Sequence, residues 1–240
     1  MERSVGKGRT VIDQPGAAQF DEYADEYAVA LERGIAVSGE SKDYFAEKRV
    51  VWLKCILGTT PTAKVLDFGC GTGSATPFLL DILGAETLIG VDISEHSLQV
   101  ARKSYPEKTS FSTLGNYVPD GTVDLAFCNG VFHHIPLADR SGAVEYVFRT
   151  LRPGGIFAFW ENNPWNLGTQ YVMWKIPFDQ DAIKIPPPGA ISLLKTGGFQ
   201  IERLDFQFVF PKSLSFLRGL EKPLASLPLG AQYQVLCRKV

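Results

Sequence analysis

The sequence of 240 residues predicts an α/β protein built on a doubly wound, mostly parallel β-sheet. Three observations support this prediction. Short apolar runs alternate with segments of helical periodicity between residues 63 and 160, a glycine-rich turn follows the first apolar run, and an aspartate follows the second. Ligands of such sheets bind beyond the carboxyl ends of the parallel strands, so the functional site is expected at that edge.

Seven segments have the apolar runs or the alternation that are typical of β-strands. We predict strands at 63–68, 87–91, 109–113, 123–128, 156–160, 200–209 and 232–239. Helical patterns lie at roughly 74–84, 94–104, 137–151, 166–176 and 213–226. Ser74 is a plausible N-cap for the first of these helices. The three prolines at 186–188 are expected to break the chain.

Composition and charge favour a small-molecule partner. The net charge is −2 and the pI is about 6.0, so no basic field is available to attract nucleic acid or a membrane surface. The N-terminal residues lack the apolar run of a signal peptide, and no segment approaches the ~18 apolar residues of a membrane span. The four cysteines form no CxxC pair, which predicts neither a zinc site nor a disulfide framework. We therefore expect a cytoplasmic protein.

The most specific local pattern is a glycine loop with an acidic partner. Gly69, Gly71 and Gly73 follow the first predicted strand, and Asp92 follows the second strand, 19 residues after Gly73. Glycine lets a ligand approach the backbone, and the aspartate can accept hydrogen bonds from a ribose diol. Asp67, just before the loop, would repel a pyrophosphate but not a cationic amino group or sulfonium. The pattern therefore favours S-adenosylmethionine over NAD.

These motifs resemble those of the class I S-adenosylmethionine-dependent methyltransferases. VLDFGCGTG at 65–73 is similar to their first motif and LIGVDIS at 88–94 to the second. PDGTVDLAFCNGVFHHI at 119–135 resembles the motif around their fourth strand, and LRPGG at 151–155 resembles the turn before the fifth. The resemblance implies a Rossmann-like, seven-stranded sheet whose last strand is antiparallel.

Composition and the resemblance together predict a domain organisation. Residues 1–16 are polar and without periodicity, so they are expected to form a flexible tail, and residues 17–240 a single methyltransferase domain. Within that domain, 17–60 would be a helical N-terminal cap, 61–160 the cofactor-binding core, and 161–240 the substrate side with the late strands.

The family pattern assigns cofactor contacts to individual residues. The glycine loop would line the methionine moiety, Asp92 would bind the ribose hydroxyls, Ile93 would pack on adenine, and Asn129 would contact the methionine amino group. Ser112 stands where many relatives carry an acidic residue near adenine. The complete set of expected cofactor-binding residues is Tyr27, Asp67, Gly69, Cys70, Gly71, Gly73, Asp92, Ile93, Ser112, Thr113 and Asn129.

Three side chains are candidates for the catalytic chemistry. His133 and His134 follow the fourth predicted strand, and histidine titrates near neutral pH, so either can serve as a general base. Glu161 ends the fifth predicted strand and can accept a proton or hold a substrate amine. Structural roles are the alternative for all three, namely orienting the loop or capping the next helix. A metal site from Asn129, Glu161 and Asn162 is disfavoured because that set is poor in carboxylates, and no metal is predicted.

The expected function is methyl transfer from S-adenosylmethionine to a small hydrophobic or aromatic acceptor, at oxygen, nitrogen or carbon. Aromatic side chains could form the wall of the acceptor pocket. They are Phe20, Tyr23, Tyr27, Tyr44, Phe45, Trp165, Tyr171 and Trp174. Two alternatives remain open. One is an NAD(P)-dependent oxidoreductase, whose Tyr-xxx-Lys pattern occurs at Tyr44–Lys48 and Tyr171–Lys175, and the other is a non-catalytic module that binds S-adenosylmethionine.

Overall fold

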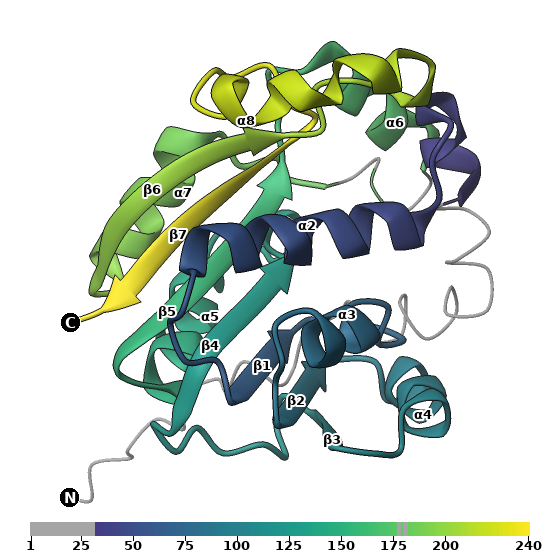
Figure 1. Cartoon of the computed structure of the whole chain (residues 1–240). Helices are drawn as coiled ribbons and strands as arrows, with labels where there is room; N and C mark the ends of the chain where they lie inside the picture. The colour runs from purple at the N-terminus through teal and green to yellow at the C-terminus, as the bar shows by residue number, and fades with distance from the viewer. Residues whose placement is uncertain (1–31, 177–178, 180–181) are drawn as a thin grey trace, which may run out of the picture.

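The computed structural model describes residues 32–176, 179 and 182–240. Its centre is a seven-stranded sheet in the order β3-β2-β1-β4-β5-β7-β6 (Figure 1). The strands are β1 (Lys64–Phe68), β2 (Thr87–Asp92), β3 (Thr109–Thr113), β4 (Val123–Asn129), β5 (Leu151–Asn162), β6 (Phe199–Gln207) and β7 (Gln232–Lys239). The first five pair in parallel, and β7 lies between β5 and β6 and is antiparallel to both. The predicted sheet, including its antiparallel last strand, is confirmed.

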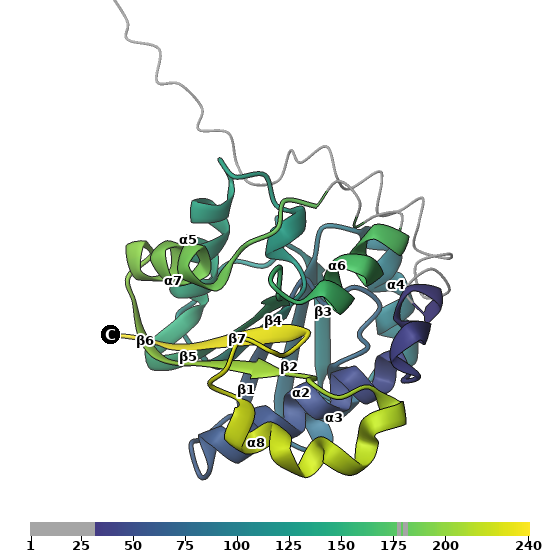
Figure 2. The ribbon, with the colours of Figure 1, turned by 90° about the horizontal axis from the view of Figure 1, so that it is seen from above.

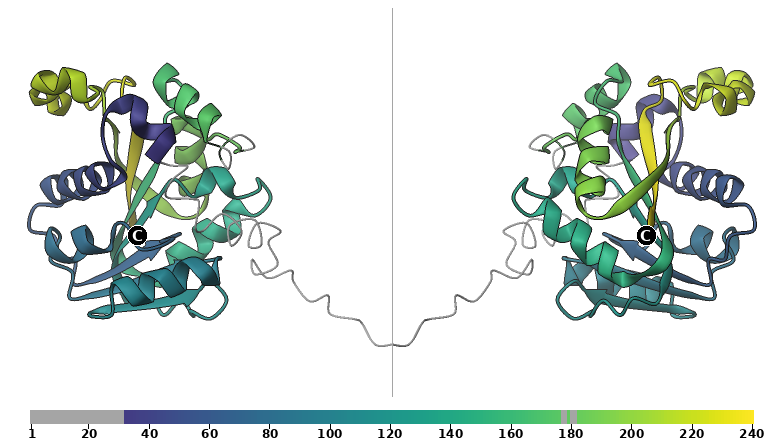
Figure 3. Two further views of the ribbon diagram at one scale, coloured as in Figure 1. Left: turned by 90° about the vertical axis from the view of Figure 1, so that its right-hand side faces the viewer. Right: turned by 90° about the vertical axis from the view of Figure 1, so that its left-hand side faces the viewer.

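Helices cover both faces of the sheet, as the side views in Figure 3 show. On one face lie α2 (Lys42–Leu57), α3 (Thr76–Asp81) and α4 (Glu95–Ser104), and on the other lie α5 (Arg140–Thr150) and α7 (Pro187–Thr196). Other helices with bounds in the described residues are α6 (Leu167–Lys175), α8 (Glu221–Leu224), and the 3-10 helices η1 (Ala36–Ser38), η2 (Phe132–His134) and η4 (Lys212–Leu220).

The two layers of core explain the sequence of the central strands. In β5, Phe157 and Phe159 pack with the cluster that contains α5 and α7, whereas Ala158 and Trp160 pack with the cluster that contains α2. Successive side chains of a strand point to opposite faces. Because both faces are covered, the strand reads as a continuous apolar run rather than an alternating one.

Three local predictions were wrong. Ser74 does not cap a helix, because the glycine loop continues as a turn in which Thr76 N–H donates to the Gly73 carbonyl, and α3 begins only at Thr76. Residues 186–188 do not end a segment but begin α7, with Pro187 in the first turn, where proline needs no N–H partner. The predicted helix at 213–226 is mostly 3-10 helix, with α8 forming a single short turn.

The predicted tail at 1–16 and the part of the predicted cap up to residue 31 lie outside the described residues. The rest of the cap contains α2, whose N-terminus is capped by the side chain of Ser41. None of the helices in the described ranges is both long and apolar enough to cross a membrane.

Candidate functional site

A pocket of about 740 Å³ opens at the carboxyl edge of the sheet. The ends of β1, β2, β4 and β5 reach it, and it is closed from the sides by η1, α2, α6 and the segment after β6. Figure 2 shows this edge from above, with α6 and η1 near the strand ends. Residues from many parts of the chain therefore meet in one cavity, which is large enough for a ligand of nucleoside size together with a second molecule.

The glycine loop forms one end of the pocket. Gly69 and Gly71 have φ angles of 73° and 52°, a region that favours glycine. A Cβ on Gly69 would lie 2.3 Å from Cγ2 of Val131, whereas a Cβ on Gly71 would meet nothing within 4 Å. The loop thus packs tightly against the segment after β4 at Gly69, while at Gly71 it faces the open cavity.

Asp92 fixes the shape of this loop from the end of β2. Its Oδ2 accepts a hydrogen bond of 2.8 Å from Gly71 N–H, and its Oδ1 accepts one of 2.9 Å from Ser94 N–H. The hydroxyl of Ser94 in turn caps α4. The carboxylate is therefore held at the pocket wall in a defined orientation, beside Ile93.

Two buried oxygen atoms of the pocket wall lack a hydrogen-bond partner among the described residues. They are Oδ2 of Asp67 and Oδ1 of Asn129. Burial, together with the nearby carboxylate of Asp92, raises the pKa of Asp67 to about 7. An unsatisfied buried acceptor costs about 1–3 kcal/mol. A ligand with a cationic N–H donor would remove this cost, and so the wall is suited to an ammonium group.

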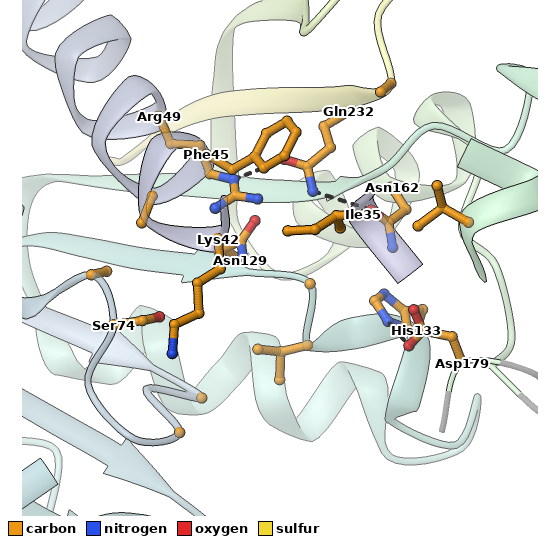
Figure 4. Close-up of a pocket in the computed structure, with 18 of the residues that line it drawn as sticks. Ile35, Lys42, Phe45, Arg49, Ser74, Asn129, His133, Asn162, Asp179 and Gln232 are labelled. Carbon is orange, nitrogen blue, oxygen red and sulfur yellow. Dashed lines mark hydrogen bonds and ion pairs between the residues drawn. The ribbon is translucent and has the colours of Figure 1, made fainter. Parts of the chain in front are cut away.

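A cluster of histidine and carboxylate side chains lies at the end of the pocket opposite the glycine loop, in segments that follow β4 and β5. Nδ1 of His133 lies 2.6 Å from Oε2 of Glu161, and Nε2 of His133 lies 3.5 Å from Oδ1 of Asp179. The same Asp179 oxygen lies 3.3 Å from Nε2 of His134. Glu161 also accepts hydrogen bonds from the backbone N–H groups of Phe132 and His133. Figure 4 shows His133 and Asp179 facing each other in the cavity.

The charges in this group stabilise one another. Burial alone would lower the pKa of His133, but the carboxylates of Glu161 and Asp179 raise it to about 10. Burial would raise the pKa of Asp179, yet hydrogen bonds from His133 and His134 hold it below its ordinary value. The two carboxylates thus favour the protonated form of His133, which makes it less suited to the role of a general base.

Cationic and amide side chains form a third part of the wall. Nε of Arg49 donates to Oε1 of Gln232 over 2.8 Å, and Nε2 of Gln232 donates to Oδ1 of Asn162 over 3.1 Å. Figure 4 shows this series of hydrogen-bonded side chains across the top of the pocket, with Lys42 reaching from α2 towards Ser74. Phe45 adds an apolar surface. This side of the pocket can accommodate a ligand with both an anionic and an apolar part.

The pocket brings together most of the residues that the sequence indicated. Its wall includes Asp67, Gly69, Cys70, Gly71, Asp92, Ile93, Asn129, His133 and His134. Gly73, Ser112, Thr113 and Glu161 do not line it, although Glu161 supports His133 from behind, and Leu114 lies at the wall where Ser112 and Thr113 were expected. Tyr27 lies outside the described residues. Sequence reasoning missed Asp179, Lys42 and Arg49, since no local motif distinguishes them.

The expected aromatic wall forms only in part. Tyr44 and Phe45 line the pocket. Trp165, Tyr171 and Trp174 are exposed on the surface and do not line it. Phe20, Tyr23 and Tyr27 lie outside the described residues. The Lys175 ammonium lies over the exposed Tyr171 ring, so the second Tyr-xxx-Lys pair is a surface contact that does not line the pocket. This does not favour the oxidoreductase alternative.

Comparisons with known proteins agree with this geometry. Residues 66–159 match a family model described as a methyltransferase domain. A trans-aconitate 2-methyltransferase of Rhizobium leguminosarum bv. trifolii is 29% identical over 164 residues, which cover 61% of this chain and 62% of that protein. A protein of the same name from Azoarcus sp. is 33% identical over 118 residues, covering 48% of this chain and 46% of that protein. The chain thus spans only about half to three fifths of the length of these relatives.

Solved structures share the fold at low sequence identity. A magnesium protoporphyrin IX methyltransferase from Synechocystis PCC 6803 with bound SAH has a TM-score of 0.63 and 19% identity, covering 93% of this chain and 98% of that one. A [4+2]-cyclase has a TM-score of 0.66 and 15% identity, covering 99% of both chains. At such identity the likeness shows the fold alone, and proteins with this fold are named for more than one reaction.

Proposed function

The chain contains a methyltransferase domain of the class I fold, and from this premise we propose that it transfers a methyl group from S-adenosylmethionine to a small acceptor. The single observation that carries the proposal is the joint geometry of the glycine loop and Asp92, in a pocket that continues to a second polar group of histidines. A cofactor and an acceptor can lie end to end in such a pocket, which is what an in-line transfer requires.

The residues fit this cofactor on the grounds of charge and space. The unsatisfied oxygens of Asp67 and Asn129 suit its ammonium group, and the open space at Gly71 suits its methionine chain. Asp92 would accept hydrogen bonds from the ribose hydroxyls, and Ile93 and Leu114 would flank the adenine. Cys70 belongs to the same proposed site. Gly73, Ser112 and Thr113 remain predicted parts of the site although they do not line the pocket. Tyr27, which lies outside the described residues, also remains a predicted part.

When bound, S-adenosylmethionine supplies a methyl group already activated by a sulfonium. The protein has to orient the acceptor, exclude water and take up the proton that the acceptor loses. We assign these tasks to the group of His133, His134 and Asp179, with Glu161 as a positioning residue because it is 1% exposed and contacts His133 rather than the cavity. Of the two imidazoles, His134 is the better candidate for a general base, because the carboxylates beside His133 favour its protonated form, and His133 stays a predicted catalytic residue.

The acceptor is proposed to be a small molecule with an apolar or aromatic part. Phe45 and Tyr44 favour the apolar part, and the acceptor atom is an oxygen, nitrogen or carbon. An acceptor that also carries a carboxylate is a second candidate, favoured by Lys42 and Arg49 in the wall and by the names of the trans-aconitate relatives. The near-neutral net charge of −2 supports a site that binds neither nucleic acid nor a membrane, and four unpaired cysteines support a cytoplasmic location.

Calorimetric titration with S-adenosylmethionine, S-adenosylhomocysteine and NADH tests the cofactor. Binding of the first two and not of NADH is expected, and binding of NADH alone would overturn the proposal. Transfer of a labelled methyl group to a panel of phenols, quinones and di- and tricarboxylates, trans-aconitate among them, then tests the reaction. Cofactor binding without transfer to any acceptor of the panel would favour a non-catalytic binding module.

A further inference from the structure

We infer that His133, His134 and Asp179 bind one divalent transition-metal ion at the acceptor end of the pocket. Each of the three offers one ligand atom, and these atoms lie within 4.8 Å of one another. All three residues line the cavity. The site rests on protein ligands alone, whereas its use in catalysis rests on the proposed methyl transfer.

Two of the three separations between the ligand atoms match those around a tetrahedral ion. Bonds of about 2.0–2.1 Å to imidazole nitrogen and 2.0–2.2 Å to carboxylate oxygen place tetrahedral ligands about 3.4 Å apart. The two separations from Oδ1 of Asp179 are 3.5 Å, to Nε2 of His133, and 3.3 Å, to Nε2 of His134. Asp179 can therefore share an ion with either imidazole with little movement, and all three ligand atoms lie within 4.8 Å of one another. Two imidazoles and one carboxylate are typical ligands of zinc and of other first-row transition metals.

Glu161 gives His133 the support that metal-bound histidines commonly have. Its Oε2 lies 2.6 Å from Nδ1 of His133, so that nitrogen carries the hydrogen and Nε2 is left to face Asp179. Two backbone N–H groups hold the carboxylate in place. The backbone of His133 is itself anchored, since Ile183 N–H donates to its carbonyl over 2.8 Å.

The charges of the group also suit a divalent cation. Glu161 and Asp179 bring two carboxylates into a region where the side chains of His133 and Asp179 are only 3% and 8% exposed. Buried charge of one sign requires a partner of the other. With both imidazoles neutral, an ion of charge +2 adds positive charge beside the two carboxylates, of which Glu161 also interacts with the guanidinium of Arg140. This set differs from the combination of Asn129, Glu161 and Asn162, because here Glu161 acts through His133.

Three protein ligands leave a fourth position for a molecule in the cavity, as in catalytic zinc sites. An acceptor hydroxyl in that position would lose its proton to water at a lower pH than it does free in solution. The acceptor oxygen would then bond to the methyl carbon while the carbon–sulfur bond breaks, and the electron pair of that bond would go to sulfur. In this arrangement His134 is a ligand and not a base.

Zinc titration of the full chain, without a histidine tag and after treatment with a chelator, tests the site. Calorimetry is expected to give one Zn²⁺ per chain, and Co²⁺ in its place is expected to give the strong visible absorption of a tetrahedral site. Asp179→Asn and His134→Asn should each weaken Zn²⁺ binding about 100-fold, and Glu161→Gln about 10-fold. Circular dichroism identifies any variant that does not fold.

Two matched controls exclude binding elsewhere on the chain. His96 is the remaining histidine, and Cys55 is the exposed thiol. His96→Ala and Cys55→Ser should bind Zn²⁺ like the parent. Absence of stoichiometric binding by the parent, or unchanged binding in both folded Asp179→Asn and His134→Asn, would overturn the inference.

A parallel titration with S-adenosylmethionine separates this inference from the proposed function. Zinc binding without cofactor binding would support the metal site and contradict the proposed methyl transfer. Cofactor binding without zinc binding would contradict the proposed metal site, and His134 would then be the candidate general base. If both bind, loss of turnover on chelation and its recovery on adding Zn²⁺ would support the use of the ion in transfer, whereas turnover unaffected by the chelator would contradict it.

Discussion

The backbone N–H of Gly71 donates a hydrogen bond of 2.8 Å to the carboxylate of Asp92, 21 residues later in the chain. This contact ties the turn after β1 to the end of β2. It holds the glycine loop open at the point where Gly71 faces the cavity. The carboxylate thus accepts from Gly71 with one oxygen and from Ser94 with the other, and lies at the pocket wall. Several predictions depend on this arrangement.

Replacement of Asp92 with alanine is expected to weaken S-adenosylmethionine binding at least ~10-fold, because hydrogen bonds to a charged group contribute about 1.5–3 kcal/mol. Calorimetry measures the loss. Asp81→Ala, at an exposed position on α3, is the control and should bind normally. Equal affinities of Asp92→Ala and parent would refute the ribose contact.

Gly71 and Gly84 form a matched pair for testing the role of the loop. Both have positive φ, 52° and 76°, and a Cβ on either meets nothing within 4 Å. Gly71→Ala and Gly84→Ala should therefore lose similar stability, about 1–2 kcal/mol each, for the left-handed backbone alone. Only the change at Gly71, and more strongly Gly71→Val, should abolish cofactor binding. A loop that serves structure alone would give two variants that bind equally.

The raised pKa of Asp67 predicts that the stability of the fold depends on pH. The folded protein holds its proton up to about pH 7, whereas the unfolded chain releases it near the ordinary value of 3.8. Folding therefore becomes less favourable as the pH rises between these values. In Asp67→Asn this contribution is absent, so urea denaturation at a series of pH values should show a smaller decline in stability towards pH 7 than in the parent. Parallel curves for the two proteins would contradict the raised pKa.

The same titration should appear in ligand binding. An ionised Asp67 attracts an ammonium group more strongly than a protonated one. Affinity for S-adenosylmethionine should fall as the pH drops below about 7. Asp67→Asn should bind more weakly at pH 8 and lose most of this pH dependence, which calorimetry at pH 6 and pH 8 can measure.

Glu161→Gln is expected to destabilise the fold by about 3 kcal/mol, because it removes one partner of a buried charge pair. Its oxygens accept from two backbone N–H groups and face Nδ1 of His133. Glu202→Gln, which removes a surface pair with Arg238, should cost less than about 1 kcal/mol. Thermal unfolding followed by circular dichroism compares the two, and similar melting temperatures would show that Glu161 does not anchor the histidine segment.

The sequence by itself determined the sheet and the part of the site formed by the glycine loop and Asp92. Seven strands, their alternation with helices, and the glycine loop followed by Asp92 are encoded in short segments, since periodicity and glycine act locally. Local reasoning also missed α7. The prolines at 186–188 were expected to break the chain, but proline that disrupts a helix interior is suited to a helix start. The roles of the individual site residues stay predictions.

Only the tertiary structure decided the other half of the site. Asp179 lies 45 residues after His134 in a segment without periodicity, and Glu161 reaches His133 from the neighbouring strand. Arg49 likewise meets Gln232 only because α2 packs near the end of β7. A contact between distant residues leaves no pattern in a single sequence. Such a contact depends on the course of the backbone, which is set by burial of the whole core. In this protein the backbone places the carboxylates of Glu161 and Asp179 beside His133 and His134.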